Sequence, residues 1–208
     1  LMYNEKMDMM KTKIKNALST LLLFSTLLVV GQDQYKADTE SSLINWKGFK
    51  PTGEHYGTVK VKSGSFTIEN KKIVAGEFEI DMNSIIDLDM AADSEYNAKL
   101  VGHLKSDDFF GVEKYPVAIF KVTSTEAKGD QTLIKGDLTI KEKTHPVSFL
   151  ATVSLDANLL TVKSEKFKID RSTYDIKFKS KSFFSDLGDQ FIDDNMELSV
   201  HVKAANTK

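Results

Sequence analysis

The stretch QTLIKGDLTIKEKTHPVSFLATVSLD, residues 131–156, decides the fold of this chain. Lysine, aspartate, serine and threonine fill most of the positions between its apolar residues, and Leu150 is the main exception. Because side chains alternate between the two faces of a strand, this pattern predicts strands with one buried face and one wet face. The apolar set is Ile134, Leu138, Ile140, Val147, Phe149, Ala151 and Val153.

The same period-two alternation covers most of the chain from residue 42 onward. Turn-forming residues such as Gly76 and Gly129 separate the apolar runs. The apolar positions change from odd to even between Val61 and Phe66, so we expect a bulge or a tight bend at Gly64. Many short strands without regularly interspersed helices favour an antiparallel barrel or a sandwich over a parallel α/β sheet.

One segment has helical rather than strand periodicity. Tyr96, Leu100 and Leu104 recur at intervals of one helical turn, and Ser94 can cap the first turn. We therefore expect a short amphipathic helix over residues 93–105, inserted between strands. Such a helix commonly covers an edge or an open end of a barrel.

The N-terminal region has the features of a targeting segment. Lysines at 11, 13 and 15 follow Met10, and an apolar run covers residues 17–30. This order is typical of a secretory signal peptide, and Val29 and Gly31 fit a cleavage site after Gly31. We expect residues 1–31 to be a signal peptide with an upstream extension, and residues 32–208 to be one exported domain, periplasmic or secreted. The alternative is an N-terminal membrane anchor.

Composition narrows the function classes. The net charge of −2 provides no basic field for nucleic acid or an anionic membrane. The absence of cysteine excludes disulfides, a thiolate zinc site and a cysteine nucleophile. The chain has no G-x-S-x-G elbow, phosphate loop or dinucleotide fingerprint, so we expect no cofactor and no catalysis.

The histidines and clustered aspartates predict no metal site. The histidines at 55, 145 and 201 have no second ligand at helical spacing. The aspartates at 87, 89 and 93 lack the central glycine and terminal glutamate of a calcium loop, so we expect a solvated loop before the helix.

Three motifs carry a resemblance to a known family. They are HLKSDDFFGVEKYP (residues 103–116), GDLTIK (136–141) followed by THPV (144–147), and FKIDRS (167–172). In this order they resemble the YceI-like polyisoprenoid-binding family, over roughly residues 35–204. The chain departs from the family pattern at Glu142 and Asp175, where glycine is usual; glycine is the residue that adopts positive φ at least cost.

The resemblance implies an all-β fold, a lipocalin-like antiparallel barrel with one short helix near its mouth, for which we expect eight strands. It also implies an exported protein that holds a long isoprenoid, an isoprenoid quinone or a similar apolar lipid inside the barrel. An eight-stranded barrel either fills with side chains or holds one slender ligand, and the sequence leaves both open. The candidate lining residues are Phe78, Ile80, Met82, Phe120, Val122, Leu138, Ile140, Val147, Phe149, Phe167, Ile169, Leu198 and Val200.

Polar residues near the motifs are candidates for contact with a lipid head group. His103 and Lys105 could bond a phosphate or quinone oxygen, although packing at the helix end is the simpler role. Arg171, beside Asp170, could bind a head group or form an ion pair that fixes a strand end. The aromatic residues Trp46, Phe49, Phe109 and Phe110 could form a hydrophobic lip or pack in the core.

Two other classes of function remain open: an envelope interaction module with a packed core, and an enzyme acting on a lipid or quinone. An open barrel mouth would also allow a homodimer. We expect neither a nucleic-acid partner nor stable membrane insertion.

Overall fold

The computed structural model of the protein describes residues 31–208. The predicted signal segment lies outside the described residues except for Gly31. Within the described part, one α-helix, α2 (Glu95–Lys105), and two 3₁₀ turns, η1 (Arg171–Tyr174) and η2 (Gly188–Gln190), accompany ten strands. These are β1 (Asp33–Ala37), β2 (Leu43–Lys50), β3 (Gly53–Glu69), β4 (Lys72–Asp87), β5 (Val117–Lys128), β6 (Gln131–Ile140), β7 (Lys143–Asp156), β8 (Leu159–Ser164), β9 (Phe167–Asp170) and β10 (Asn195–Asn206).

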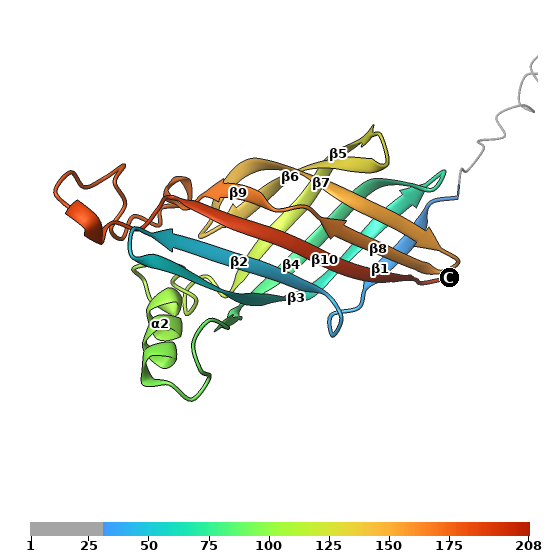
Figure 1. The fold of residues 1–208 in the computed structure, drawn as a ribbon. Helices are drawn as coiled ribbons and strands as arrows, with labels where there is room; N and C mark the ends of the chain where they lie inside the picture. Colours follow the sequence, from blue (N-terminus) through green and yellow to red (C-terminus); the bar gives the residue numbers. More distant parts are fainter. Residues whose placement is uncertain (1–30) are drawn as a thin grey trace, which may run out of the picture. The chain divides into compact units, whose positions relative to one another are not determined.

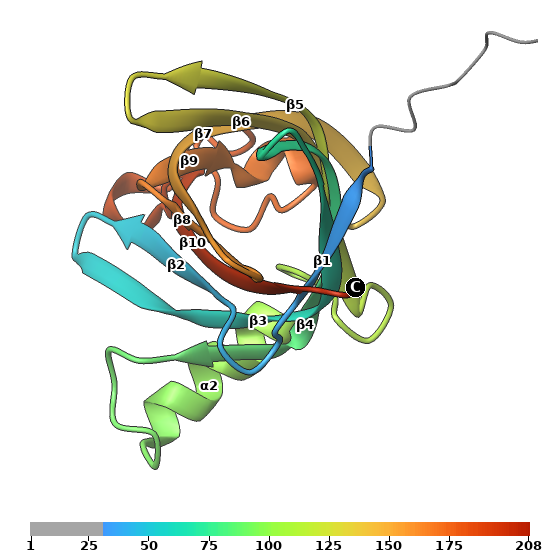
Figure 2. The same cartoon turned by 90° about the vertical axis from the view of Figure 1, so that its right-hand side faces the viewer.

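The strands close into a ring. From β2 to β8 each strand pairs antiparallel with the next, and β10 pairs with both β2 and β8. Figure 1 shows the barrel from the side, and Figure 2 looks down the barrel, so that the strands are seen as a ring. The predicted eight-stranded antiparallel barrel with one short helix is therefore confirmed. Ring closure leaves no open edge among these strands, because each has two neighbours.

The long strand β3 turns a corner of the barrel through bulges. Its pairing with β4 shifts register between Thr58 and Lys60, and again between Val61 and Ser63. The second shift lies next to Gly64, where the sequence predicted a bulge or bend. A Cβ at Gly64 would lie 2.2 Å from the Phe78 ring, so glycine is needed there for the strands to approach.

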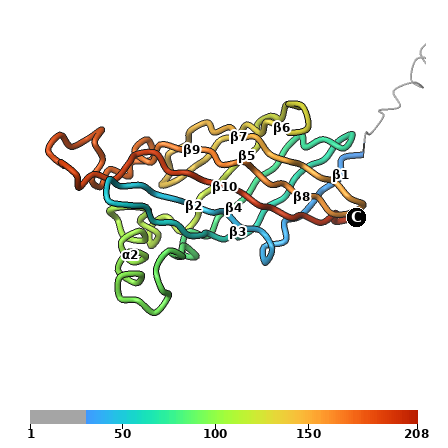
Figure 3. Tube along the Cα trace, in the orientation of Figure 1, coloured from blue at the N-terminus to red at the C-terminus, as the bar shows by residue number. Residues whose placement is uncertain are grey.

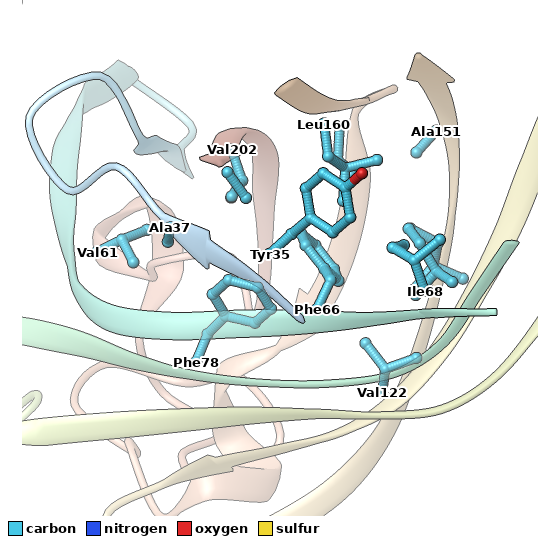
Figure 4. Packing of buried hydrophobic residues seen from close by; sticks show 14 of the residues in the cluster. Tyr35, Ala37, Val61, Phe66, Ile68, Phe78, Val122, Ala151, Leu160 and Val202 are labelled. Carbon is cyan, nitrogen blue, oxygen red and sulfur yellow. The ribbon is translucent and has the colours of Figure 1, made fainter. Parts of the chain in front are cut away.

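One end of the barrel is plugged by side chains. Strand β1 crosses this end, where it pairs with both β10 and β3. Its Tyr35 is buried together with Phe66 and Phe78, whose ring centroids lie 4.6 Å apart (Figure 4). The C-terminus of the chain lies at the same end (Figure 3). We call this the closed end.

The opposite end carries helix α2 and the loop segment of residues 175–194 (Figures 1 and 3). We call this end the mouth. Ser94 caps α2 by accepting a hydrogen bond from the Tyr96 amide, as the sequence predicted. Leu104 is buried, but Tyr96 is exposed, and Asn97 takes the inward position in that turn. No helix within residues 31–208 has both the length and the apolar character needed to cross a membrane.

The two positions where the resemblance leads us to expect glycine, 142 and 175, lie in left-handed backbone. Glu142 has φ of +61° in the turn between β6 and β7, and Asp175 has φ of +62° at the end of η1. The chain therefore keeps the glycine conformation with residues that adopt it at a cost of about 1–2 kcal/mol each.

Candidate functional site

A cavity of about 250 Å³ opens at the mouth of the barrel. Its walls come from β2, β3, β4, β5, β6, β9 and β10, and α2 and η1 contribute to its rim. Most of the lining side chains are apolar; the ionisable exceptions within the described residues are Lys50, His55, His103, Arg171 and Asp193. The site is therefore an apolar chamber with a few polar groups, the usual composition of a small-molecule site.

A second cavity of about 80 Å³ lies deeper in the barrel and is lined by apolar side chains throughout. The two cavities share Ile44, Ile80, Leu138 and Leu198. These four side chains, which we call the waist, separate the chamber at the mouth from the inner one. Beyond the inner cavity lie the packed side chains of the closed end.

The candidate lining residues lie almost entirely on the inner wall. Val122 is the exception, because it is buried in the closed-end core and does not line either cavity. Residues that line the mouth cavity or the waist are Ile80, Met82, Leu138, Ile140, Ile169 and Leu198. Residues that line only the inner cavity are Phe78, Phe120, Val147, Phe149, Phe167 and Val200. Their contact with a ligand stays a prediction.

Several wall residues were not among the predicted lining set. Trp46, Phe49, Phe109 and Phe110, the candidate lip, all line the mouth cavity. Ile44 was missed, although its alternation with Trp46 along β2 is a signal that could have found it. Ile192 lies in an irregular polar segment, where periodicity gives no signal.

Arg171 is buried next to the mouth cavity and connects the two ends of the 175–194 loop segment. Its guanidinium donates hydrogen bonds to the main-chain carbonyls of Asp193, Ile176 and Ile192, at 3.0, 2.8 and 3.0 Å. Its side chain is only 2% exposed. A guanidinium fork that bonds several carbonyls at once is a structural clamp, so these contacts favour the structural role over the head-group role.

The acidic partner of Arg171 is Asp194, not the neighbouring Asp170. Arg171 Nη2 lies 3.3 Å from Asp194 Oδ1, whereas Asp170 caps η1 by accepting a hydrogen bond from the Ser172 amide. The sequence left open a head-group contact or an ion pair for Arg171, and the structure shows an ion pair whose partner is Asp194. Burial alone would raise the pKa of Asp194, but hydrogen bonds from Ser180 and Ser182 and the charge of Arg171 outweigh it and hold that pKa below its usual value.

The other two head-group candidates differ in position. His103 lines the mouth cavity, where its ring meets Phe109 and Phe178 edge-on and its Nε2 lies 3.0 Å from Asp108 Oδ2. Lys105, at the end of α2, does not line either cavity. Of these two residues, His103 is therefore the one placed to contact a head group in the mouth cavity.

A polar cluster at the α2 side of the rim was missed by sequence reasoning. His55 Nδ1 lies 3.0 Å from Asp89 Oδ2, and one ligand-type atom from each of His55, Asp87 and Asp89 lies within 4.8 Å of the others. Asp87 is 4% exposed, so the prediction that these aspartates form a solvated loop is wrong for Asp87. Burial, and then the adjacent Asp89 carboxylate, raise the pKa of Asp87 to about 6.

Comparison with known proteins places this geometry in a family. A YceI-like domain model matches residues 35–204. Protein YceI of Escherichia coli O157:H7 is 30% identical over 187 residues, which is 86% of this chain and 91% of that protein. A UPF0312 protein of Pseudomonas putida is 33% identical over 147 residues, covering 67% of this chain and 73% of that protein.

Solved structures agree on the fold. BcnA of Burkholderia cenocepacia superimposes with a TM-score of 0.60 at 21% identity, covering 81% of this chain and 99% of that one. A polyisoprenoid binding domain from Saccharophagus degradans gives 0.59 at 17% identity, covering 83% and 98%. With the family model matching nearly the whole barrel and a relative aligned over most of both chains, this protein belongs to the YceI-like domain family.

Proposed function

We propose that this protein binds the apolar chain of an isoprenoid-class lipid inside the barrel, with the polar end of that lipid at the mouth, and that it acts as a carrier rather than an enzyme. The observation that carries the proposal is the pair of cavities that follow one another into the barrel. The relative from Saccharophagus degradans, described as a polyisoprenoid binding domain, supports the ligand class.

Cavity size indicates how much lipid the barrel can enclose. An apolar cavity of about 150 Å³ accommodates benzene, a molecule of six carbons. The volumes of 250 and 80 Å³ therefore correspond to roughly 12–15 carbons, or two to three isoprene units, on the same scale. A longer chain would need the waist side chains to move, or would extend out of the mouth.

The energy of burial is sufficient for stable binding. Each buried methylene contributes about 0.8 kcal/mol, so 12 carbons would bring roughly 10 kcal/mol before any costs. Ordering of the chain and loss of its free motion offset several kcal/mol of this gain. Costs of at least about 4 kcal/mol leave a net value of at most about 6 kcal/mol, which corresponds to a Kd of tens of micromolar, and polar contacts at the rim would tighten it.

The composition of the inner wall supports binding without catalysis. Acid–base chemistry needs an ionisable side chain within hydrogen-bond reach of the reacting atom. Among residues 31–208, those that line the inner cavity are all isoleucine, leucine, valine or phenylalanine. Export, which we also propose, is supported by the signal-like pattern of residues 10–31 and would place the carrier in the periplasm or outside the cell.

Organic extraction of gently purified protein, followed by mass spectrometry, tests the proposal. We expect one apolar lipid per chain. The variant Leu198→Trp should block the waist and reduce the retained lipid at least tenfold, because the larger ring occupies the passage between the cavities.

The matched control is Ser199→Trp, which adds the same ring one position along β10, where the side chain faces outward and accepts a bond from Asn45. It should keep the lipid. The proposal fails if the wild-type protein carries no lipid and takes up no added polyprenol, or if Leu198→Trp folds and retains as much lipid as Ser199→Trp.

A further inference from the structure

We propose that His55, Asp87 and Asp89 form a binding site for one divalent transition-metal ion of the Zn²⁺ type at the α2 side of the barrel mouth. The three ligands come from different elements: His55 from β3, Asp87 from the end of β4, and Asp89 from the loop that follows. One donor atom from each lies within 4.8 Å of the other two. His55 also lines the mouth cavity, but the inference does not depend on the lipid.

The Asp87 carboxylate is the observation that points to a ligand. The residue is only 4% exposed, and its Oδ1 atom has no hydrogen-bond donor among the described residues, since its neighbour across the cluster is the Asp89 carboxylate. Its other oxygen, Oδ2, already accepts bonds from Asn97 and from the Met90 amide, so Oδ1 is the oxygen left for the cluster. A buried carboxylate oxygen without a partner is costly, and a metal ion would satisfy it.

Hydrogen bonds from the surrounding chain hold the ligands in place. The Tyr56 amide donates to Asp89 Oδ1, which leaves Oδ2 directed at His55. Asn97 of α2 fixes Asp87 by donating to its Oδ2 and to its main-chain carbonyl. Outer contacts of this kind orient the ligands of metal sites and typically change affinity by 10- to 100-fold when removed.

The donor set selects the class of ion. One imidazole nitrogen and two carboxylate oxygens match zinc with an open fourth position, and they fall short of the six to eight oxygens that calcium takes. Lys50 Nζ lies 3.3 Å from His55 Nε2, on the far side of the ring from the proposed ion. An ion bound through Nδ1 leaves the imidazole proton on Nε2, which then can no longer accept a hydrogen bond from Lys50. We therefore expect Lys50 to turn away when the site is loaded.

Titration calorimetry of the full chain with Zn²⁺ alone, after removal of metals and of any affinity tag, tests the site. We expect binding of one ion per chain. Zn²⁺ at about 100 times its Kd should raise the Tm by roughly 5–10 °C, because the ion ties β3, β4 and the loop before α2 together. The variants His55→Gln and Asp89→Asn should each weaken binding at least tenfold.

Matched controls are His201→Gln and Asp93→Asn, which change the same residue types elsewhere and should bind Zn²⁺ like the wild type. Anomalous diffraction at the zinc edge from wild-type crystals gives a second readout that needs no variant to fold. The proposal is overturned if the wild type does not bind Zn²⁺ at 100 µM, if the anomalous peak lies elsewhere, or if His55→Gln binds as tightly as His201→Gln.

Discussion

Replacing Arg171 by lysine tests whether the mouth loops depend on a guanidinium clamp. The side chain bonds three carbonyls that lie on two segments: Ile176 just after η1, and Ile192 and Asp193 before β10. Lysine keeps the charge, and with it the attraction to Asp194, but its ammonium cannot reach all three carbonyls from one position.

The expected loss follows from the bonds left unmade. Hydrogen bonds to a charged group contribute about 1.5–3 kcal/mol each, and lysine would leave two of the three unmade. We therefore expect Arg171→Lys to lower the free energy of unfolding by roughly 3–6 kcal/mol. For a domain of this size the Tm would fall by roughly 10–20 °C.

The assay is thermal unfolding followed by circular dichroism, with Lys168→Arg as the reverse swap on the exposed face of β9. Lipid retention is measured on the same samples below both melting temperatures. A stable clamp predicts a lower Tm for Arg171→Lys and no change for Lys168→Arg. The reasoning is refuted if Arg171→Lys keeps the wild-type Tm and loses the lipid, because Arg171 would then act on the ligand.

Three further predictions concern stability measured by denaturant unfolding. Gly136→Ala should lower the free energy of unfolding by roughly 1–3 kcal/mol, because a Cβ there would lie 2.5 Å from the Phe120 ring. The control is Gly48→Ala, whose Cβ meets nothing within 4 Å, and equal effects of the two variants would contradict the prediction. Glu142→Gly should add about 0.5–1 kcal/mol by relieving its positive φ, and a loss would show that the turn is not strained. The pKa of Asp87 is about 6 in the folded protein and 3.8 in the unfolded chain, so the folded state holds this proton more tightly. The resulting stabilisation is fully present below pH 4 and is lost as the pH rises through 6. In metal-free buffer the wild type should therefore lose up to about 3 kcal/mol more than Asp87→Asn between pH 4 and 7, and parallel pH profiles would contradict this.

Strand identity was predictable because alternation is a local property. The inward positions of β6 and β7, from Ile134 to Phe149, follow directly from the period of two. The corner in β3 was also visible, because the change of parity around Gly64 requires an extra residue on one strand. Ring closure itself could be expected only through the family resemblance.

Contacts between distant segments were not predictable. His55 and Asp89 meet only because β3 and β4 pair in one particular register, which periodicity does not fix. The acidic partner of Arg171 was hidden as well, because Asp194 reaches it from the loop before β10. The open space in the lumen was equally hidden, since it depends on how all the side-chain volumes add up inside the ring.

The plug formed by Tyr35, Phe66 and their neighbours makes the lumen a blind tube. A lipid that enters such a tube must do so with its apolar tail first, and it can leave only by the same path. The head group would therefore stay on the outside throughout, available to whatever delivers or receives the lipid. Exchange would occur at the rim, where α2 and the clamped loops determine how readily a partner membrane or protein gains access.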